Sequence, residues 1–258
     1  MEGRKLNRID KKLLRMVLMA LFAALAYLAP LVIHIPYPAP SGKPFVHPGN
    51  MVVVLAALLL GGWQGGLSGA IGLGLYDITQ GYIIEAPKNM LLKFGIGFFT
   101  GLVFSRGRKN DGGKPRIPLF IISAVSFCLG GIILAGKISG WAGFEKVSFV
   151  AYLFMFILGL LLLLIALLSF KYPFFDRELM YAAMGSVTGM AWNLVGHFST
   201  KVVGLLIQGS EFNAAVTTSL LSMPASIINA GFSIVGAIIL YQPLKRALVK
   251  AGLGRALE

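Results

Sequence analysis

Eight apolar runs, separated by short polar stretches, constrain the fold of this chain more than any other feature. A helix of about 20 apolar residues spans the hydrocarbon core of a bilayer, and a shorter one spans it only where other parts of the protein cover its ends. Most of the runs are long enough to predict membrane-spanning helices. The runs are Leu14–Ile35, Met51–Gly61, Gly66–Ile83, Met90–Ser105, Ile117–Ala135, Val147–Phe170, Leu179–Leu206 and Val216–Tyr241.

The composition excludes a water-soluble protein. Hydrophobic residues make up 57% of the 258 residues and charged residues 13%, against roughly 25% charged residues in soluble domains. This leaves too little polar surface to cover a soluble globule. We therefore expect an all-α integral membrane protein that forms one transmembrane domain over residues 1–258. The single cysteine, Cys128, lies in an apolar run and predicts neither a disulfide nor a thiol metal site.

The second run, Met51–Gly61, is too short to cross a bilayer alone. The glycine-rich stretch 61–66 follows it and breaks the helix. We expect a short, half-buried helix in a tight hairpin.

The positions of Lys and Arg predict the orientation, because these residues accumulate in cytoplasmic loops. If the N-terminus is inside, the inside regions are 1–15, 62–65, 106–116, 171–178 and 242–258. They hold all but six of the 23 Lys and Arg residues. We expect both termini inside, with a basic cytoplasmic N-terminus over residues 1–15. This placement accounts for most of the net charge of +13 without a nucleic-acid partner. The six others are Lys43, Lys88, Lys93, Lys137, Lys146 and Lys201.

Polar side chains at membrane depth are costly and are candidates for function. On the predicted topology they all fall in the outer half of the membrane or in the outer loops, whereas the inner halves of the spans carry almost no ionisable group. Taken singly, each could be an interfacial or packing residue. Together they predict a polar pocket that opens outward. The candidates are His34, His47, Asn50, Asp77, Tyr82, Glu85, Asn89, Lys93, Asn193, His197, Lys201 and Asn229.

The apolar inner halves bear on mechanism. A secondary carrier or an ion channel needs polar groups that reach both faces of the membrane. We therefore expect the chain to bind a molecule from outside but not to pass it inward alone, which implies a partner. Ala20 and Ala24 lie one turn apart on the first helix, and small residues at this spacing let another helix approach closely. The spacing also suits packing within the chain, as do the paired glycines of the third and fourth runs.

The longest polar stretch, 106–116, has glycines that suggest a phosphate-binding loop. Such a loop needs Ser or Thr after Gly-Lys and a strand before it. Here Pro115 follows Lys114 and no strand is predicted. We expect a flexible cytoplasmic linker and no cofactor in this chain, so any ATP is bound by a partner.

Several short motifs, in order, resemble the substrate-binding S components of energy-coupling factor (ECF) vitamin transporters, in the branch with riboflavin and hydroxymethylpyrimidine transporters. The resemblance covers about two thirds of the chain. The C-terminal part of the similar region, roughly 182–248, contains Met223-Pro224 and Tyr241-Gln242-Pro243-Leu244. The earlier motifs are His47-Pro48-Gly49-Asn50, Ala56–Gly62, Gly72, Tyr76-Asp77, Gly81-Tyr82, Ala86-Pro87 and Lys93.

The resemblance implies a vitamin bound by outer loops and outer helix halves. It also implies docking through Ala20 and Ala24 onto a transmembrane coupling subunit that two ATPases drive. The sequence departs from the family in two places. Asn50 stands where many relatives carry an acid, and residues 117–170 read as an extra hairpin inserted into a six-helix core.

Two other functions fit the sequence less well than this one. A self-sufficient secondary transporter is disfavoured by the apolar inner half. A membrane-embedded enzyme is disfavoured because the three histidines, His34, His47 and His197, form no metal motif and no nucleophile elbow is present.

The substrate itself is not specified by the sequence. Trp192, Tyr82 and Tyr76 suit stacking on a flat heteroaromatic ring. Asn89, Asn193 and Asn229 suit its polar edge, and Lys93 and His197 suit an anionic group, although a neutral vitamin would fit as well.

Overall fold

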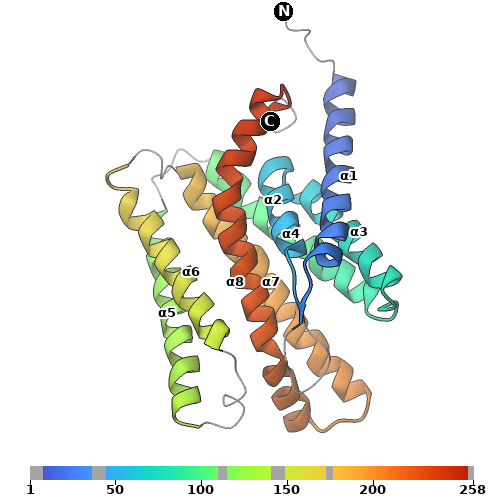
Figure 1. Cartoon of the computed structure of the whole chain (residues 1–258), viewed down its shortest axis with the longest axis vertical. Helices are drawn as coiled ribbons and strands as arrows, with labels where there is room; N and C mark the ends of the chain where they lie inside the picture. Colours follow the sequence, from blue (N-terminus) through green and yellow to red (C-terminus); the bar gives the residue numbers. More distant parts are fainter. Residues whose placement is uncertain (1–7, 37–44, 110–114, 141–148, 173–176, 255–258) are drawn as a thin grey trace, which may run out of the picture.

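The structure is a computed structural model that describes residues 8–36, 45–109, 115–140, 149–172 and 177–254. These residues form a bundle of helices with a two-stranded ribbon, β1 (Ile35–Pro36) paired antiparallel with β2 (Phe45–Val46). Both termini lie at one end of the molecule (Figure 1). The helices are α1 (Arg8–Val32), α2 (Gly49–Leu60), α3 (Gly62–Thr79), α4 (Ala86–Lys109), α5 (Arg116–Ile138), α6 (Phe149–Leu168), α7 (Arg177–Ile207) and α8 (Phe212–Lys250).

Each predicted apolar run lies mainly in one of these helices, and the prediction of an all-α membrane protein is confirmed. Four helices (α1, α4, α5 and α8) are long and apolar enough to span a membrane within the described residues. Several helices continue into polar sequence beyond the predicted run, because backbone hydrogen bonding does not stop where the apolar side chains end. The clearest case is α8, which has 39 residues, against the 26 of its predicted run.

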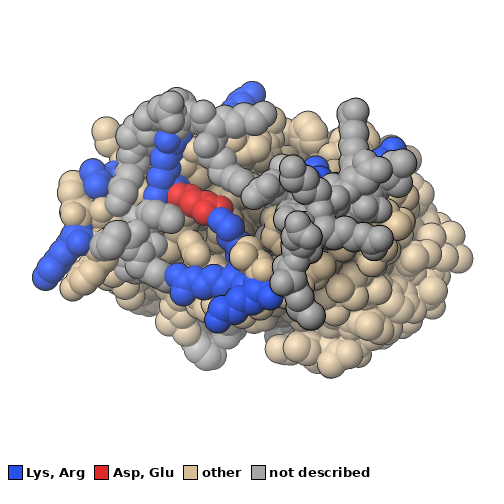
Figure 2. Space-filling model, turned by 90° about the horizontal axis from the view of Figure 1, so that it is seen from above, with Lys and Arg blue, Asp and Glu red and all other residues tan. Residues whose placement is uncertain are grey.

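Some predicted features lie outside the described residues. These are Lys43, Lys146, part of the basic N-terminus and part of the linker 106–116. The face at the terminus end is rich in Lys and Arg among its described residues (Figure 2), as the positive-inside rule requires of a cytoplasmic face.

The short helix α2 is more deeply enclosed than the half-buried helix that we predicted. Ten of its twelve residues are buried, because α1, α3, α4 and α8 all pack around it. The chain then turns sharply at Gly61, whose φ of 100° suits glycine, and α3 begins at the next residue. The tight hairpin is as expected, but α2 is a central core helix.

Glycines let α3 and α4 pack almost backbone to backbone. A methyl group on Gly97 would lie 2.2 Å from the backbone nitrogen of Gly66, and one on Gly101 would lie 2.2 Å from that of Gly62. Neither backbone atom can move aside without shifting its helix. These glycines therefore pack the chain's own helices, one of the two roles that the sequence left open.

We expect Gly97→Leu to destabilise the bundle by about 3 kcal/mol or more, because overpacking against a fixed backbone costs more than displacing a side chain. Thermal unfolding and gel filtration in detergent would measure the loss. Gly131→Leu on α5 is the matched control, since a side chain there meets nothing within 4 Å. Similar melting temperatures for the two variants would contradict this account of the interface.

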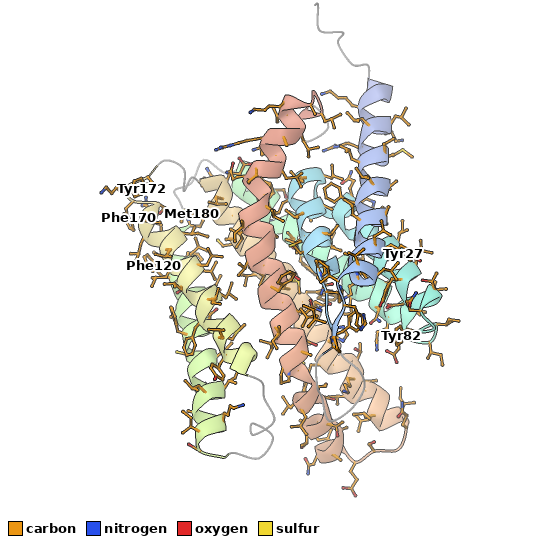
Figure 3. All side chains as sticks on the ribbon, viewed as in Figure 1. Tyr27, Tyr82, Phe120, Phe170, Tyr172 and Met180 are labelled. Carbon is orange, nitrogen blue, oxygen red and sulfur yellow. The ribbon has the colours of Figure 1, made fainter. Side chains whose placement is uncertain are left out.

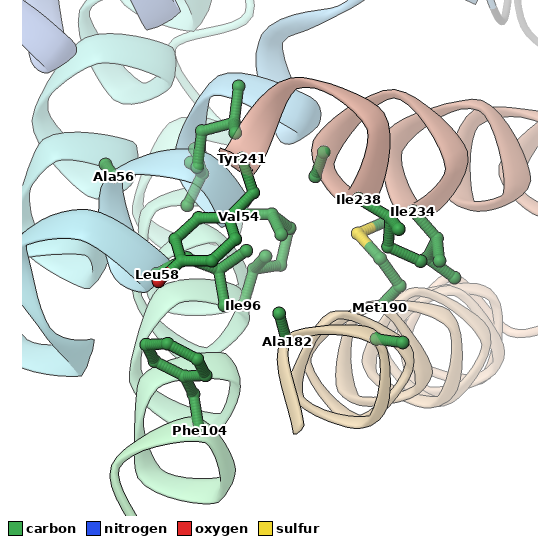
Figure 4. Close-up of a cluster of buried hydrophobic side chains, with 14 of the residues drawn as sticks. Val54, Ala56, Leu58, Ile96, Phe104, Ala182, Met190, Ile234, Ile238 and Tyr241 are labelled. Atoms are coloured by element: carbon green, nitrogen blue, oxygen red, sulfur yellow. The ribbon is translucent and has the colours of Figure 1, made fainter. Parts of the chain in front are cut away.

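Side chains from four helices meet in the core (Figure 4). Val54 of α2, Ile96 of α4, Met190 of α7 and Ile234 of α8 are all buried there. Nearer the terminus end, the hydroxyl of Tyr241 donates to Glu178 at 2.5 Å.

The Glu178 carboxylate also pairs with Lys245 at 2.6 Å. Since Tyr241 and Lys245 belong to α8 and Glu178 to α7, this network ties the two long helices together.

The residues predicted as an extra hairpin, 117–170, correspond to α5 and α6. These two helices pack on each other, and the Ser123 hydroxyl of α5 donates to the carbonyl of Gly159 in α6 at 2.8 Å. They lie at one side of the bundle (Figure 1) and meet it mainly where α6 contacts α8. Helices α2, α3, α4, α7 and α8 contribute to the cavity described next.

Candidate functional site

A polar cavity of about 180 Å³ lies where several helix ends converge. The N-terminal turn of α2, the C-terminal part of α3 and the first turns of α4 contribute to it, together with β2 and the middle of α7 and α8. Eight of the predicted candidates line this cavity. The lining residues are Phe45, His47, Asn50, Leu73, Tyr76, Asp77, Asn89, Lys93, Asn193, His197, Ala225, Ser226 and Asn229.

His47 organises the entry to α2. Its Nδ1 accepts a hydrogen bond from the backbone N–H of Gly49 at 3.1 Å, and its own backbone N–H donates to Oδ1 of Asn229 at 3.4 Å. Burial lowers the pKa of His47 to about 3, with the charges of Lys93 and His34 as lesser causes. The ring is therefore neutral at pH 7, and because Nδ1 is an acceptor, Nε2 carries the proton and can donate.

Lys93 and Asn193 meet across the cavity from α4 and α7. The ammonium donates to Oδ1 of Asn193 at 3.3 Å, although the two residues are 100 positions apart. Both are buried, with Lys93 only 7% exposed. A buried ammonium is costly unless several acceptors surround it, and one amide oxygen at this distance satisfies only part of its capacity. The arrangement suits a ligand that brings a further acceptor.

Asp77 and Asn89 form a second pair, between α3 and α4. The Asn89 amide donates to the Asp77 carboxylate at 2.9 Å, which brings two of the candidate polar residues together. The Oδ1 atoms of Asn89 and Asn50 are buried and accept no hydrogen bond from the described residues. A buried carbonyl oxygen without a donor costs about 1–3 kcal/mol. Two such oxygens beside one cavity suit a ligand with N–H or O–H donors.

An aromatic side chain that the sequence analysis did not single out also lines the cavity. Phe45 stacks on His34 with ring centroids 3.8 Å apart, and its ring lies 6.1 Å from that of Tyr76. The strand pairing of β1 with β2 brings Phe45 beside His34. The signal available in the sequence was its position two residues before His47, because side chains two residues apart in an extended segment point to the same side.

Five predicted residues, His34, Tyr82, Glu85, Trp192 and Lys201, lie outside the cavity lining. Tyr82 is 44% exposed and sits in the loop that joins α3 to α4, at the periphery (Figure 3). Glu85 is exposed in the same loop and forms an ion pair with Lys88. Trp192 points toward α4, where its ring lies 4.9 Å from that of Phe99 and fills the space beside Gly95. Of the predicted stacking residues, Tyr76 alone lines the cavity.

Substituting Trp192 with leucine is expected to change ligand affinity by no more than about twofold, because its indole does not border the cavity. Substituting Phe45 with leucine should weaken binding by about tenfold if its ring stacks on a ligand ring. Titration of the two purified variants would separate these positions. A larger loss of ligand affinity for Trp192→Leu than for Phe45→Leu would indicate that Trp192, and not Phe45, stacks on the ligand.

Ala20 and Ala24 are exposed on α1. The opposite face of the helix packs on α3, where a methyl group on Gly72 would lie 2.3 Å from the carbonyl oxygen of Ala23. The two alanines therefore face away from the bundle and do not serve packing within the described chain. A small-residue stripe on a free helix face suits close approach by another helix.

Comparison with known proteins identifies the family of this chain. The family model of the S component of the ECF-type riboflavin transporter matches residues 11–153. A protein of Pyrococcus woesei, described as an uncharacterized protein in a gap 3′ region, is 31% identical over 122 residues, which is 47% of this chain and 70% of that protein. No solved structure matches the chain. Since the family model covers more than half of the sequence, this chain belongs to the family of ECF-type riboflavin transporter S components.

Proposed function

We propose that this protein is the high-affinity substrate-binding subunit of an ECF-type ABC importer in a prokaryotic plasma membrane. It captures a vitamin or vitamin precursor from outside and delivers it through a transmembrane coupling subunit. Two ATPase subunits bind the ATP that drives delivery. The proposal rests above all on one observation: the polar cavity gathers buried amide oxygens, of Asn50 and Asn89, that have no donor within the described residues.

The cavity chemistry favours a flat ring with polar groups of both kinds on its edge. The side-chain oxygens of Asn50 and Asn89 accept hydrogen bonds from N–H or O–H groups of the ligand. The ammonium of Lys93 and Nε2 of His47 donate hydrogen bonds to a ligand oxygen or ring nitrogen. The Phe45 ring supplies a stacking surface. Since about 180 Å³ is below the ~300 Å³ of common small-molecule pockets, the ring is enclosed and any longer substituent extends toward the outer opening.

Delivery needs a partner because the floor of the cavity is apolar. One turn below Asn50 lies Val54, and one turn below Lys93 lies Ile96; both are fully buried. A carrier that works alone needs strongly polar or ionisable groups leading to the second face. Among the described residues, the buried polar side chains on α4, α7 and α8 beneath the cavity are the hydroxyl groups of Thr100, Ser186 and Ser233, and none of these is ionisable. The exposed face of α1 with Ala20 and Ala24 is the docking surface in this proposal.

The test begins with the protein as purified from cells grown on rich medium. Mass spectrometry of small molecules released on denaturation should identify a retained vitamin or precursor, and titration should give a dissociation constant in the nanomolar range. Riboflavin is the first candidate, because the family is described by it. The absence of any retained or titratable vitamin-like compound would contradict the binding role.

Proteoliposomes separate the proposal from its alternative, a self-sufficient secondary transporter. We expect no uptake of the identified ligand by this protein alone. Uptake should appear when the coupling subunit, the two ATPases and ATP are added. Uptake by the isolated protein, driven by an ion gradient, would establish the alternative.

A further inference from the structure

A second cavity, of about 380 Å³, lies far from the polar one, between α6, α7 and α8. Its walls are mostly aliphatic. Ile165 of α6, Leu179 of α7 and Ile238 of α8 are buried, whereas Ile239 is 59% exposed and borders the outside of the bundle. The cavity is therefore an apolar pocket that is open toward the surroundings of the helices, which in a membrane protein are lipid.

The same cavity has a polar end. Gln242 and Arg246 line it from α8 and lie one turn apart. Pro243, between them, has no N–H, so the carbonyl of Ile239 cannot accept the usual helical hydrogen bond from residue 243. An apolar wall, an amide, a guanidinium and a carbonyl without its helical donor together make an amphipathic site.

The position of the polar end matches a membrane boundary. Arg246 lies in the last turns of α8, Leu179 in the first turn of α7, and Ile165 in the last turn of α6. All three belong to the end of the molecule that carries both termini (Figure 1). Lys and Arg gather on that face (Figure 2). The surroundings of the polar end therefore favour an anion.

We propose that this cavity binds an anionic glycerophospholipid from the leaflet at the terminus end. One lipid chain lies against Leu161, Ile165 and Ile238, and the phosphate contacts Arg246, whose planar guanidinium suits phosphate oxygens. The cavity, of about 380 Å³, is too small to hold a protein helix, which is about 10–12 Å across. A flexible alkyl or isoprenoid chain is narrow enough to enter.

The lipid would join two parts of the fold. The hairpin of α5 and α6 meets the bundle mainly through α6 against α8, and the cavity lies at this junction. A chain seated there contacts both helices at once and fills space that their side chains leave open. Occupancy is thus expected to stabilise the attachment of the hairpin as well as to hold the lipid.

Native mass spectrometry of the full-length protein in detergent, titrated with phosphatidylglycerol or phosphatidylcholine, tests the proposal. We expect a single phosphatidylglycerol to bind at least about fivefold more tightly than phosphatidylcholine, since one basic side chain near a membrane surface contributes about that factor. Arg246→Gln should remove this preference. Lys250→Gln, in the last turn of α8 but outside the cavity, is the matched control and should keep it.

A second variant tests the apolar part. Leu161→Phe, on the half-buried edge of the cavity, narrows the chain site and should weaken both lipids. Thermal unfolding shows whether each variant is folded. Equal affinity for the two lipids in the wild type, or an unchanged preference in Arg246→Gln, would overturn the proposal. If Leu161→Phe loses both lipids, and neither the wild type nor any variant prefers one headgroup, the occupant is apolar and uncharged. That result would also overturn the proposal.

Discussion

Replacing both Ala20 and Ala24 with tryptophan is expected to abolish uptake by the assembled transporter while leaving ligand affinity unchanged. The two alanines are exposed on α1, and close helix approach tolerates only small side chains. Two indoles would hold a partner helix away from the contact. Uptake by proteoliposomes that contain the coupling subunit and both ATPases measures the first effect, and titration of the purified variant measures the second.

A matched control keeps this prediction specific. Leu129 is 47% exposed on α5, which lies on the opposite side of the molecule from α1 (Figure 1). Leu129→Trp therefore adds bulk at an exposed position away from α1. We expect normal uptake by that variant. A normal transport rate for the double alanine variant would show that the partner docks elsewhere, and reduced ligand affinity would show that the change damages the fold.

Alanine at Lys93 or at Asn193 is expected to weaken ligand binding about ten- to hundredfold. Each substitution removes a polar group that lines the cavity and leaves a buried polar atom, on the neighbour or on the ligand, without its partner. Such an atom costs about 1–3 kcal/mol, which corresponds to that range of affinity. Calorimetric titration of the purified variants with the identified ligand would measure the change.

The double variant and a distant control complete this test. Because Lys93 and Asn193 contact each other, their effects should not add, and the double variant should bind more tightly than the product of the two losses predicts. Lys137→Ala, near the end of α5 and outside the cavity lining, should bind as the wild type does. Equal affinities in all four variants would show that these polar residues are structural.

The sequence predicted the helices well because hydrophobic length is a local property. Each apolar run lies mainly in one helix, and the short second run with its glycines marked the turn at Gly61. The enclosure of α2 could not be predicted in this way. A short, very apolar segment is equally consistent with a half-buried helix and with a central one. α2 is central because four other helices pack around it.

The candidate site, too, could be predicted from the sequence only in part. Helical spacing placed Asn89 with Lys93 on one face of α4, and Asn193 with His197 on one face of α7. The asymmetry of polar groups between the two halves of the membrane indicated a pocket. Which faces meet is a matter of helix rotation, and this is set by contacts such as the glycine packing of α3 on α4.

The sequence by itself determined that this is an all-α membrane protein with its polar groups gathered toward one side, because bilayer thickness and the cost of burying polar groups act on every segment independently. Tertiary structure alone decided which aromatic residues border the cavity, Phe45 and Tyr76 and not Trp192 or Tyr82. It also decided which small residues pack within the chain and which, like Ala20, remain exposed. The physical reason is that a side chain's neighbours depend on the rotation and pairing of whole helices, which residues far apart in the sequence fix together.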